Sequence, residues 1–180
     1  MTLPDLDAWL PRPQVRTRHR RDASAGADAL WTAAQGVRLS DTGTLGRIIR
    51  WRIPGVPAEQ TFGGLFAADP FTVLAEGEHW SISGLCGRIW TLARDYARLD
   101  GPEDFRGWQA PRTVRVLMAH WVEEGAGGRN ALVSEARVQP TDRVASLRLR
   151  SLWLVMGPFE RLIGAEPLTV AAARAEREAH

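Results

Sequence analysis

The sequence contains no lysine: all of its 23 basic residues are arginine, against 21 acidic residues and a formal net charge of +2. This absence excludes Schiff-base chemistry and a phosphate-binding loop that depends on lysine. The arginines are mixed with Asp and Glu along the chain, apart from Arg16, Arg18, Arg20 and Arg21. Because nucleic-acid binding uses a continuous basic surface, we expect no nucleic-acid partner.

Cysteine and long apolar runs are also scarce. The single Cys86 excludes an internal disulfide and any multi-cysteine metal site, and we expect it to be a small buried residue. No segment approaches the roughly 18 apolar residues of a membrane span, and residues 1–12 have no apolar run of signal-peptide length. These absences favour a cytoplasmic protein with no membrane span.

Tyrosine occurs once, whereas tryptophan occurs eight times. Tryptophan rings either fill a core or line a roomy apolar pocket, and their number alone does not separate these alternatives. With 180 residues the chain is of the usual size for one domain. Pro4, Pro11 and Pro13 remove backbone donors near the start, so we expect a flexible arm over residues 1–13 and a single domain over residues 14–180.

The periodicity of the apolar residues predicts an α+β protein. Alternation over residues 14–22 indicates a first strand, and residues 24–36 and 41–51 have the spacing of two short helices. Further strands are predicted at residues 71–76, 79–86, 88–94, 104–108, 112–124 and 131–140, which gives about seven in all. A long helix follows from Thr141 towards His180. Since it is apolar around most of its girth, we expect a curved antiparallel sheet to wrap around it.

Two sequence blocks are similar to those of a known superfamily. The hairpin from Trp80 to Trp90 resembles a G-x-x-G-[RK]-x-W pattern, and the segment from Leu132 to Val138, followed by Thr141 and Asp142, resembles a T-x-T-E-T-R-V-x-x-T-D strand end. Together with the order of elements, these blocks resemble the START and polyketide-cyclase-like helix-grip superfamily (SRPBCC), in an uncharacterised bacterial branch. The resemblance implies a helix-grip fold with a cavity between the sheet and the last helix. Members range from carriers to cyclases, so the fold leaves the activity open.

Several motifs have a simple structural interpretation. Asp41-Thr42-Gly43 matches an aspartic-protease signature, but that site needs two copies, and Asp41 is better explained as a helix cap. His79 and His120 lack the spacing of metal ligands, so we expect no metal site and no cofactor. Cys86 has no recognisable base beside it.

Glu135 and Arg137 lie on the same face of their strand because side chains alternate. We favour a structural ion pair with Arg115 or Glu123 of the next strand. The alternative places Arg137 at the cavity, where its guanidinium would hold a ligand carboxylate.

The alternation of the long strand places one apolar set towards the helix, and His120 would be its polar member. We expect two residues of the predicted strand at 79–86 and three residues of the long C-terminal helix to face this set across the cavity. The predicted ligand-binding residues are Trp80, Ile82, Val114, Val116, Met118, His120, Leu152, Met156 and Phe159. Core packing alone would explain the same pattern.

These features favour a protein that binds an apolar, aromatic or lipid-like small molecule in its cavity. An alternative is a cyclase- or dehydratase-like enzyme that uses His120 or a nearby carboxylate to move a proton on a ketide. A second alternative is a protein-interaction module that exposes Leu117 and Trp121 on the outer face of the sheet. The sequence predicts no oligomeric state.

Overall fold

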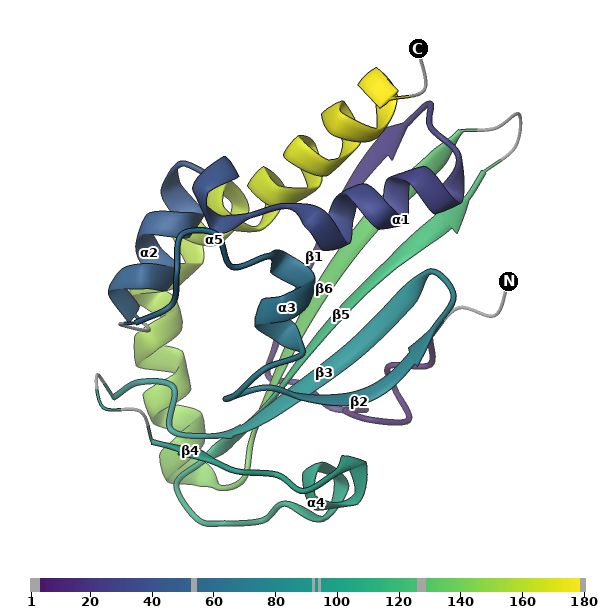
Figure 1. Ribbon diagram of the computed structural model, residues 1–180. Helices are drawn as coiled ribbons and strands as arrows, with labels where there is room; N and C mark the ends of the chain where they lie inside the picture. The colour runs from purple at the N-terminus through teal and green to yellow at the C-terminus, as the bar shows by residue number, and fades with distance from the viewer. Residues whose placement is uncertain (1–3, 53–54, 92, 94, 126–128, 179–180) are drawn as a thin grey trace.

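The computed structural model describes residues 4–52, 55–91, 93, 95–125 and 129–178, except the side chains of residues 51–52 and 158–163. Its strands are β1 (Val15–Ala23), β2 (Thr72–Gly77), β3 (Trp80–Gly87), β4 (Tyr96–Ala97), β5 (Val114–Glu124) and β6 (Asn130–Pro140). Its helices are α1 (Ala27–Gly36), the 3-10 turn η1 (Leu39–Asp41), α2 (Thr44–Arg52), α3 (Phe62–Phe66), α4 (Pro102–Gly107) and α5 (Arg143–Glu178) (Figure 1).

The strands form one antiparallel sheet in the order β1-β6-β5-β3-β2, and the short β4 pairs with β3. The centre of the sheet is the β5–β6 pair, which is in register from Val114 opposite Pro140 to Glu124 opposite Asn130. Helices α1, α2, α3 and α5 cover one face, whereas α4 and the N-terminal segment lie at the other (Figure 1). A curved antiparallel sheet with a long C-terminal helix confirms the predicted α+β helix-grip fold.

Two predicted strands are wrong. Residues 104–108 belong partly to α4, which has Pro102 at its start and Glu103 and Asp104 in its first turn. Proline at this position and acidic groups near the helix N-terminus both favour a helix. The predicted strand at residues 88–94 is absent among its described residues, and β4 begins only at Tyr96. The described part of the chain therefore has six strands rather than about seven.

Helix α5 begins at a side-chain cap. Asp142 Oδ1 accepts the backbone N–H of Ala145 at 2.8 Å, and Oδ2 accepts that of Arg112 at 2.6 Å. These hydrogen bonds to backbone N–H groups lower the pKa of the Asp142 carboxyl. The helix continues without interruption through Gly157, Pro158 and Gly164 to Glu178.

The two halves of α5 are buried to different extents. Leu168, Ala171, Ala172 and Ala175 of the second half are buried in a core cluster with α1. In the first half, by contrast, Leu154 is 81% exposed. The expectation that the sheet surrounds this helix on several sides is therefore wrong for its first half.

Among the described residues, no helix combines the length and the apolar character needed to cross a bilayer.

The convex face of the sheet is also covered. Leu6, Trp9 and Leu10 of the N-terminal segment are buried there, in the same core cluster as Leu117 and Trp121 of β5. Phe105 of α4 joins this cluster; a Cβ on Gly84 would lie 2.6 Å from its ring, so glycine allows α4 to pack closely. A loosely held arm does not fit residues 4–13, because their leucines and tryptophan bury apolar surface against the sheet.

A buried ion pair ties the N-terminal segment to β6. Arg137 Nε donates to Glu135 Oε1 at 2.6 Å, and Nη1 donates to Asp7 Oδ1 at 2.5 Å and to the carbonyl oxygen of Leu10 at 3.0 Å. Arg16 of β1 also contacts Glu135 Oε1 at 2.8 Å. The interpretation of Glu135 and Arg137 as a structural pair is confirmed, but their partners come from residues 7–16 rather than from Arg115 or Glu123.

Replacing Arg137 should destabilise the fold. In Arg137→Ala, Glu135 stays buried with only the half-exposed Arg16 beside it, and the free energy of unfolding should fall by about 3 kcal/mol. The matched control is Arg18→Ala, because the Arg18–Glu123 pair is much more exposed and should contribute less than about 1 kcal/mol. Urea denaturation measures both values; equal losses in the two variants would contradict a special role for the buried pair.

Candidate functional site

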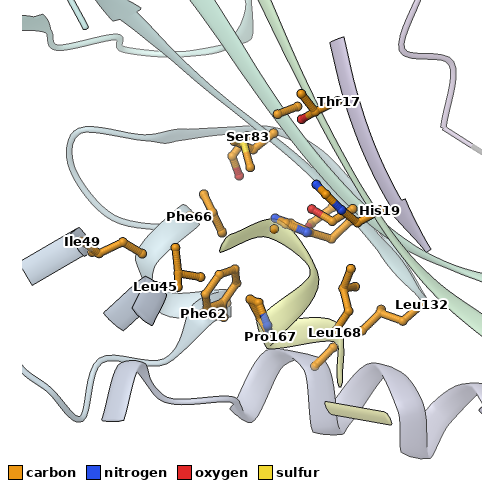
Figure 2. Close-up of a pocket in the computed structure, with 18 of the residues that line it drawn as sticks. Thr17, His19, Leu45, Ile49, Phe62, Phe66, Ser83, Leu132, Pro167 and Leu168 are labelled. Carbon is orange, nitrogen blue, oxygen red and sulfur yellow. The ribbon is translucent and has the colours of Figure 1, made fainter. Parts of the chain in front are cut away.

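A cavity of about 370 Å³ lies between the concave face of the sheet and the helices. This volume is within the range of about 300–1,000 Å³ that is typical of small-molecule sites. Residues of β1, β2, β3, β5 and β6 form its sheet side, and residues of α1, α2, α3 and α5 form its helix side. Figure 2 shows Thr17 and His19 on the sheet side, and Leu45, Ile49 and Phe62 on the helix side.

A row of polar side chains crosses the sheet side of the cavity. In order across the strands, the row consists of Glu76, Ser81, His120, Ser134 and His19. Each residue lies directly opposite the next one in the strand register, and all five line the cavity. Neighbouring strands are about 4.8 Å apart, so the polar row extends over roughly 19 Å.

The helix side of the cavity is predominantly apolar. It is formed by Ala34, Leu45, Ile48, Ile49, Phe62, Phe66, Trp153, Met156, Pro167 and Leu168, together with Gln35, Gly63, Ala67 and Gly164. The sheet side also contributes the apolar Val73, Met118, Leu132 and Ala136. A molecule in this space would therefore contact aliphatic or aromatic groups on both sides, and the polar row on the sheet side only. Such a lining suits a flat or elongated apolar ligand that carries a few hydrogen-bonding atoms along one edge.

His120 is the central group of the polar row. Its ring lies 4.8 Å from the Phe66 ring and 6.2 Å from the Phe62 ring, between centroids. Burial among these groups lowers the pKa of His120 from 6.5 to about 4, so the imidazole is neutral at pH 7. Its Nε2 atom is buried and has no hydrogen-bond partner in the described part of the chain. A ligand hydroxyl or carbonyl could supply the missing hydrogen bond.

Two contacts of α5 join it to elements that line the cavity. At Gly164 the helix approaches β1 so closely that a Cβ would lie 2.3 Å from His19 Nε2, so a larger residue there would require the His19 ring to move. At Glu166, Oε1 accepts the backbone N–H of Gly43 at 2.5 Å and Oε2 accepts that of Leu45 at 2.9 Å. Glu166 therefore caps the start of α2, although the sequence assigned that role to Asp41. Asp41 instead accepts Arg38 N–H and pairs with Arg174.

The predicted cavity residues separate into three groups. Met118, His120 and Met156 line the cavity, as the sequence predicted. Trp80 and Ile82 do not: Ile82 pairs with Ala119, and both Trp80 and Ile82 pack in the convex-face cluster with Phe105. Their placement in the cavity is wrong, because the register of β3 against β5 turns Ser81 and Ser83 inward instead.

The remaining predicted residues lie beside the cavity or outside the described part. Val114 and Val116 are on the concave face, as predicted, but they pack against Leu149 of α5 in a separate core cluster. Leu152 is half-buried and does not line the cavity. The side chain of Phe159 lies outside the described residues.

Other candidate groups lie away from the cavity. His79 is buried, and its Nε2 lies 2.7 Å from Asp28 Oδ1; with Glu78, these groups bring three potential metal-ligand atoms within 4.8 Å of one another. Both carboxylates are exposed, and their site is at the β2–β3 turn rather than in the cavity. Cys86 is fully buried, and burial raises the pKa of its thiol to about 12, which makes it unreactive at neutral pH.

Comparison with known proteins gives likenesses of fold only. The chain matches no protein-family model and no curated protein. Solved structures that resemble it include jhp0584 of Helicobacter pylori, with a TM-score of 0.40, 9% identity, and coverage of 97% of this chain and 99% of that one. TTHA0849 of Thermus thermophilus has a TM-score of 0.37, 11% identity, and coverage of 92% of this chain and 100% of that one.

The Zhui aromatase/cyclase of Streptomyces sp. R1128 also resembles this chain, with a TM-score of 0.37, 16% identity, and coverage of 92% of this chain and 96% of that one. At such low scores these likenesses carry no information on activity. The observed order of strands and helices is that of the predicted helix-grip fold.

The depressed pKa of His120 predicts a pH dependence of stability. Between about pH 6.5 and pH 4 the unfolded chain binds a proton at this histidine that the folded chain does not bind. Stability due to the neutral ring is therefore lost as the pH falls through this range, by about 2–3 kcal/mol. His120→Gln should lose less stability between pH 7 and pH 4.5 than the parent protein, measured by urea denaturation. The same loss in both proteins would show that His120 titrates normally.

Proposed function

We propose that this protein binds an apolar, aromatic or lipid-like small molecule in the cavity between its sheet and α5. The observation that carries the proposal is the two-sided lining of the cavity. Helices α2, α3 and α5 contribute aliphatic and aromatic side chains, whereas the sheet contributes the polar row together with Val73, Met118, Leu132 and Ala136. Within the described residues, His120 Nε2 is buried in this lining without a hydrogen-bond partner, and a buried polar atom left unpaired is costly unless a ligand or water pairs with it.

The polar row also suggests how the ligand would be oriented. The free Nε2 atom of His120 and the hydroxyl groups of Ser81 and Ser134 lie on three adjacent strands. They would accept or donate hydrogen bonds along one edge of the ligand. Phe62 and Phe66, which border His120, would then contact its apolar body. Apolar contacts would supply most of the affinity, and the polar row would set the orientation.

Filling the cavity should abolish ligand binding. Ala136 lies in the cavity between Thr17 and Met118 in the strand register, so Ala136→Phe would place an aromatic ring in the space. Binding of the apolar fluorophore N-phenyl-1-naphthylamine is followed by quenching of tryptophan emission. The affinity should fall by roughly tenfold or more, which corresponds to 1.4 kcal/mol.

Ala8→Phe is the matched control, because Ala8 is exposed in the N-terminal segment and outside the cavity. This variant should bind the fluorophore like the parent protein. An unchanged affinity in Ala136→Phe, or the absence of any quenching in the parent protein, would contradict the proposed binding function.

A cyclase- or dehydratase-like enzyme is the second candidate, favoured by the inward position of His120. A neutral imidazole can accept a proton from a carbon next to a carbonyl group. Two features weaken this candidate: a pKa of about 4 makes the ring a weak base, and within the described part of the chain no carboxylate hydrogen-bonds to it. Glu76 of the polar row lies two strands away, at roughly 10 Å.

Proton abstraction by His120 can be tested without the natural substrate. The protein should accelerate the exchange of the α-protons of 2-tetralone for deuterium, followed by NMR, if the ring acts as a base on a bound ketone. His120→Gln should remove this acceleration, while Ala8→Phe should retain it. Exchange at the rate of buffer alone would leave binding as the function of the cavity and contradict the enzymatic alternative.

The structure does not favour the second alternative, a protein-interaction module that exposes Leu117 and Trp121. Leu117 is fully buried and Trp121 is 5% exposed, because the N-terminal segment and α4 cover this face of the sheet. The sequence assigned both residues to an exposed apolar patch, and that assignment is wrong.

A further inference from the structure

The first half of α5 presents an apolar strip to solvent. Val144, Leu147, Leu154 and Val155 are 43%, 62%, 81% and 65% exposed, and they are the exposed large hydrophobic residues of the described chain. At 3.6 residues per turn these four positions lie within about 100° of the helix circumference. We call them the α5 ridge. Trp153 and Met156 of the same segment point instead to the cavity, so the ridge is not needed to line it.

Arginines border the α5 ridge on both sides. Arg143 and Arg150 lie four residues before Leu147 and Leu154, and residues at this spacing are neighbours on a helix surface. Arg148 borders the opposite side, four residues after Val144. All three arginines are exposed, and within the described residues none of them forms an ion pair. The sequence has no acidic residue between Asp142 and Glu160.

This combination determines the kind of surface that would cover the ridge. A helix that lies in a membrane interface places apolar side chains at the boundary of the acyl chains and basic side chains among the headgroups. Long arginine side chains can extend from the edge of an apolar strip to reach phosphate groups. Anionic headgroups also attract basic residues with an energy that corresponds to about a fivefold gain in binding per arginine.

A second copy of the chain fits the ridge less well. In a two-fold symmetric dimer the same surface meets itself, so the arginines along the borders of one ridge would face those of the other. Like charges in such a contact oppose association. A helical protein partner would need a groove, because the ridge is convex, whereas a bilayer surface requires no matching shape.

We propose that the α5 ridge docks the protein on the surface of an anionic phospholipid bilayer, without crossing it. The proposal does not depend on what the cavity binds, since the ridge and the cavity lie on opposite sides of the same helical segment. Docking would place Leu147, Leu154 and Val155 at the level of the acyl chains and the three arginines at the level of the phosphates.

The test is flotation of the full-length protein with vesicles. The protein should float with vesicles that contain phosphatidylcholine and phosphatidylglycerol, bind at least tenfold less to vesicles of phosphatidylcholine alone, and dissociate at high salt. Leu154→Ser combined with Val155→Ser should reduce binding by at least tenfold. These side chains are exposed, so the melting temperature should not change.

A matched pair of charge-reversal variants isolates the role of the arginines. Arg148→Glu with Arg150→Glu should abolish flotation. Arg21→Glu with Arg177→Glu changes the net charge equally at exposed positions outside the ridge, of which Arg177 is about 30 Å further along α5, and it should retain most of the binding.

Three results would overturn the proposal: no flotation of the parent protein with anionic vesicles, equal loss of binding in both charge-reversal pairs, or a dimer in solution that Leu154→Ser with Val155→Ser dissociates. Light scattering detects the dimer. Fluorophore binding by the same variants reports separately on the cavity, so failure of the docking proposal is distinguishable from failure of the proposed ligand-binding function.

Discussion

The pairing of β5 with β3 on one side and with β6 on the other determines which side chains enter the cavity. Because side chains alternate along a strand, this register brings His120 opposite both Ser81 and Ser134 on the concave face. A shift of β3 by one residue would turn Ile82 inward and Ser81 outward. The polar row therefore exists only in this register, and so does the contrast between the two sides of the cavity on which a ligand-binding function would depend.

The periodicity of apolar residues predicts most of the helices and strands. It predicts which face of a strand points into the cavity only where the element that covers one face is known. The alternation of β5 correctly placed Val114, Met118 and His120 on the concave face, because the helix lies on that side. The same reasoning failed for β3, where Trp80 and Ile82 were placed inside because they are apolar. The N-terminal segment and α4 cover the convex face, so apolar residues occur on both faces of β3 and polarity alone does not separate them. Pairing β3 with β5 so that Ser81 lies opposite His120 would have placed Ser81 on the cavity side and indicated the polar row.

Contacts between distant parts of the chain account for the remaining differences. Arg137 donates hydrogen bonds to the Asp7 carboxylate and to the Leu10 carbonyl oxygen, which lie about 130 positions earlier in the sequence. The local sequence pattern around Arg137 does not predict partners at that separation. The prolines of residues 4–13 prevent regular structure, but they do not prevent Leu6 and Trp9 from packing on the sheet. The many apolar residues of α5 led to the prediction that this helix is buried on several sides. Four of these residues instead form the exposed α5 ridge. Hydrophobic content alone cannot separate a surface that packs inside the protein from one that faces solvent.

The carboxylate of Glu166 connects two sides of the cavity. It belongs to α5, and its oxygens accept N–H groups from the first turn of α2, where the positive end of the helix dipole also favours an anion. Hydrogen bonds to the backbone of Leu45, Gly43 and Thr44 lower the pKa of Glu166 against the opposing effect of its burial. Leu45 and Ile49 of α2 line the cavity, so these hydrogen bonds attach one part of the cavity wall to α5. The position of that part of the wall therefore depends on a carboxylate that lies more than 100 residues further along the chain.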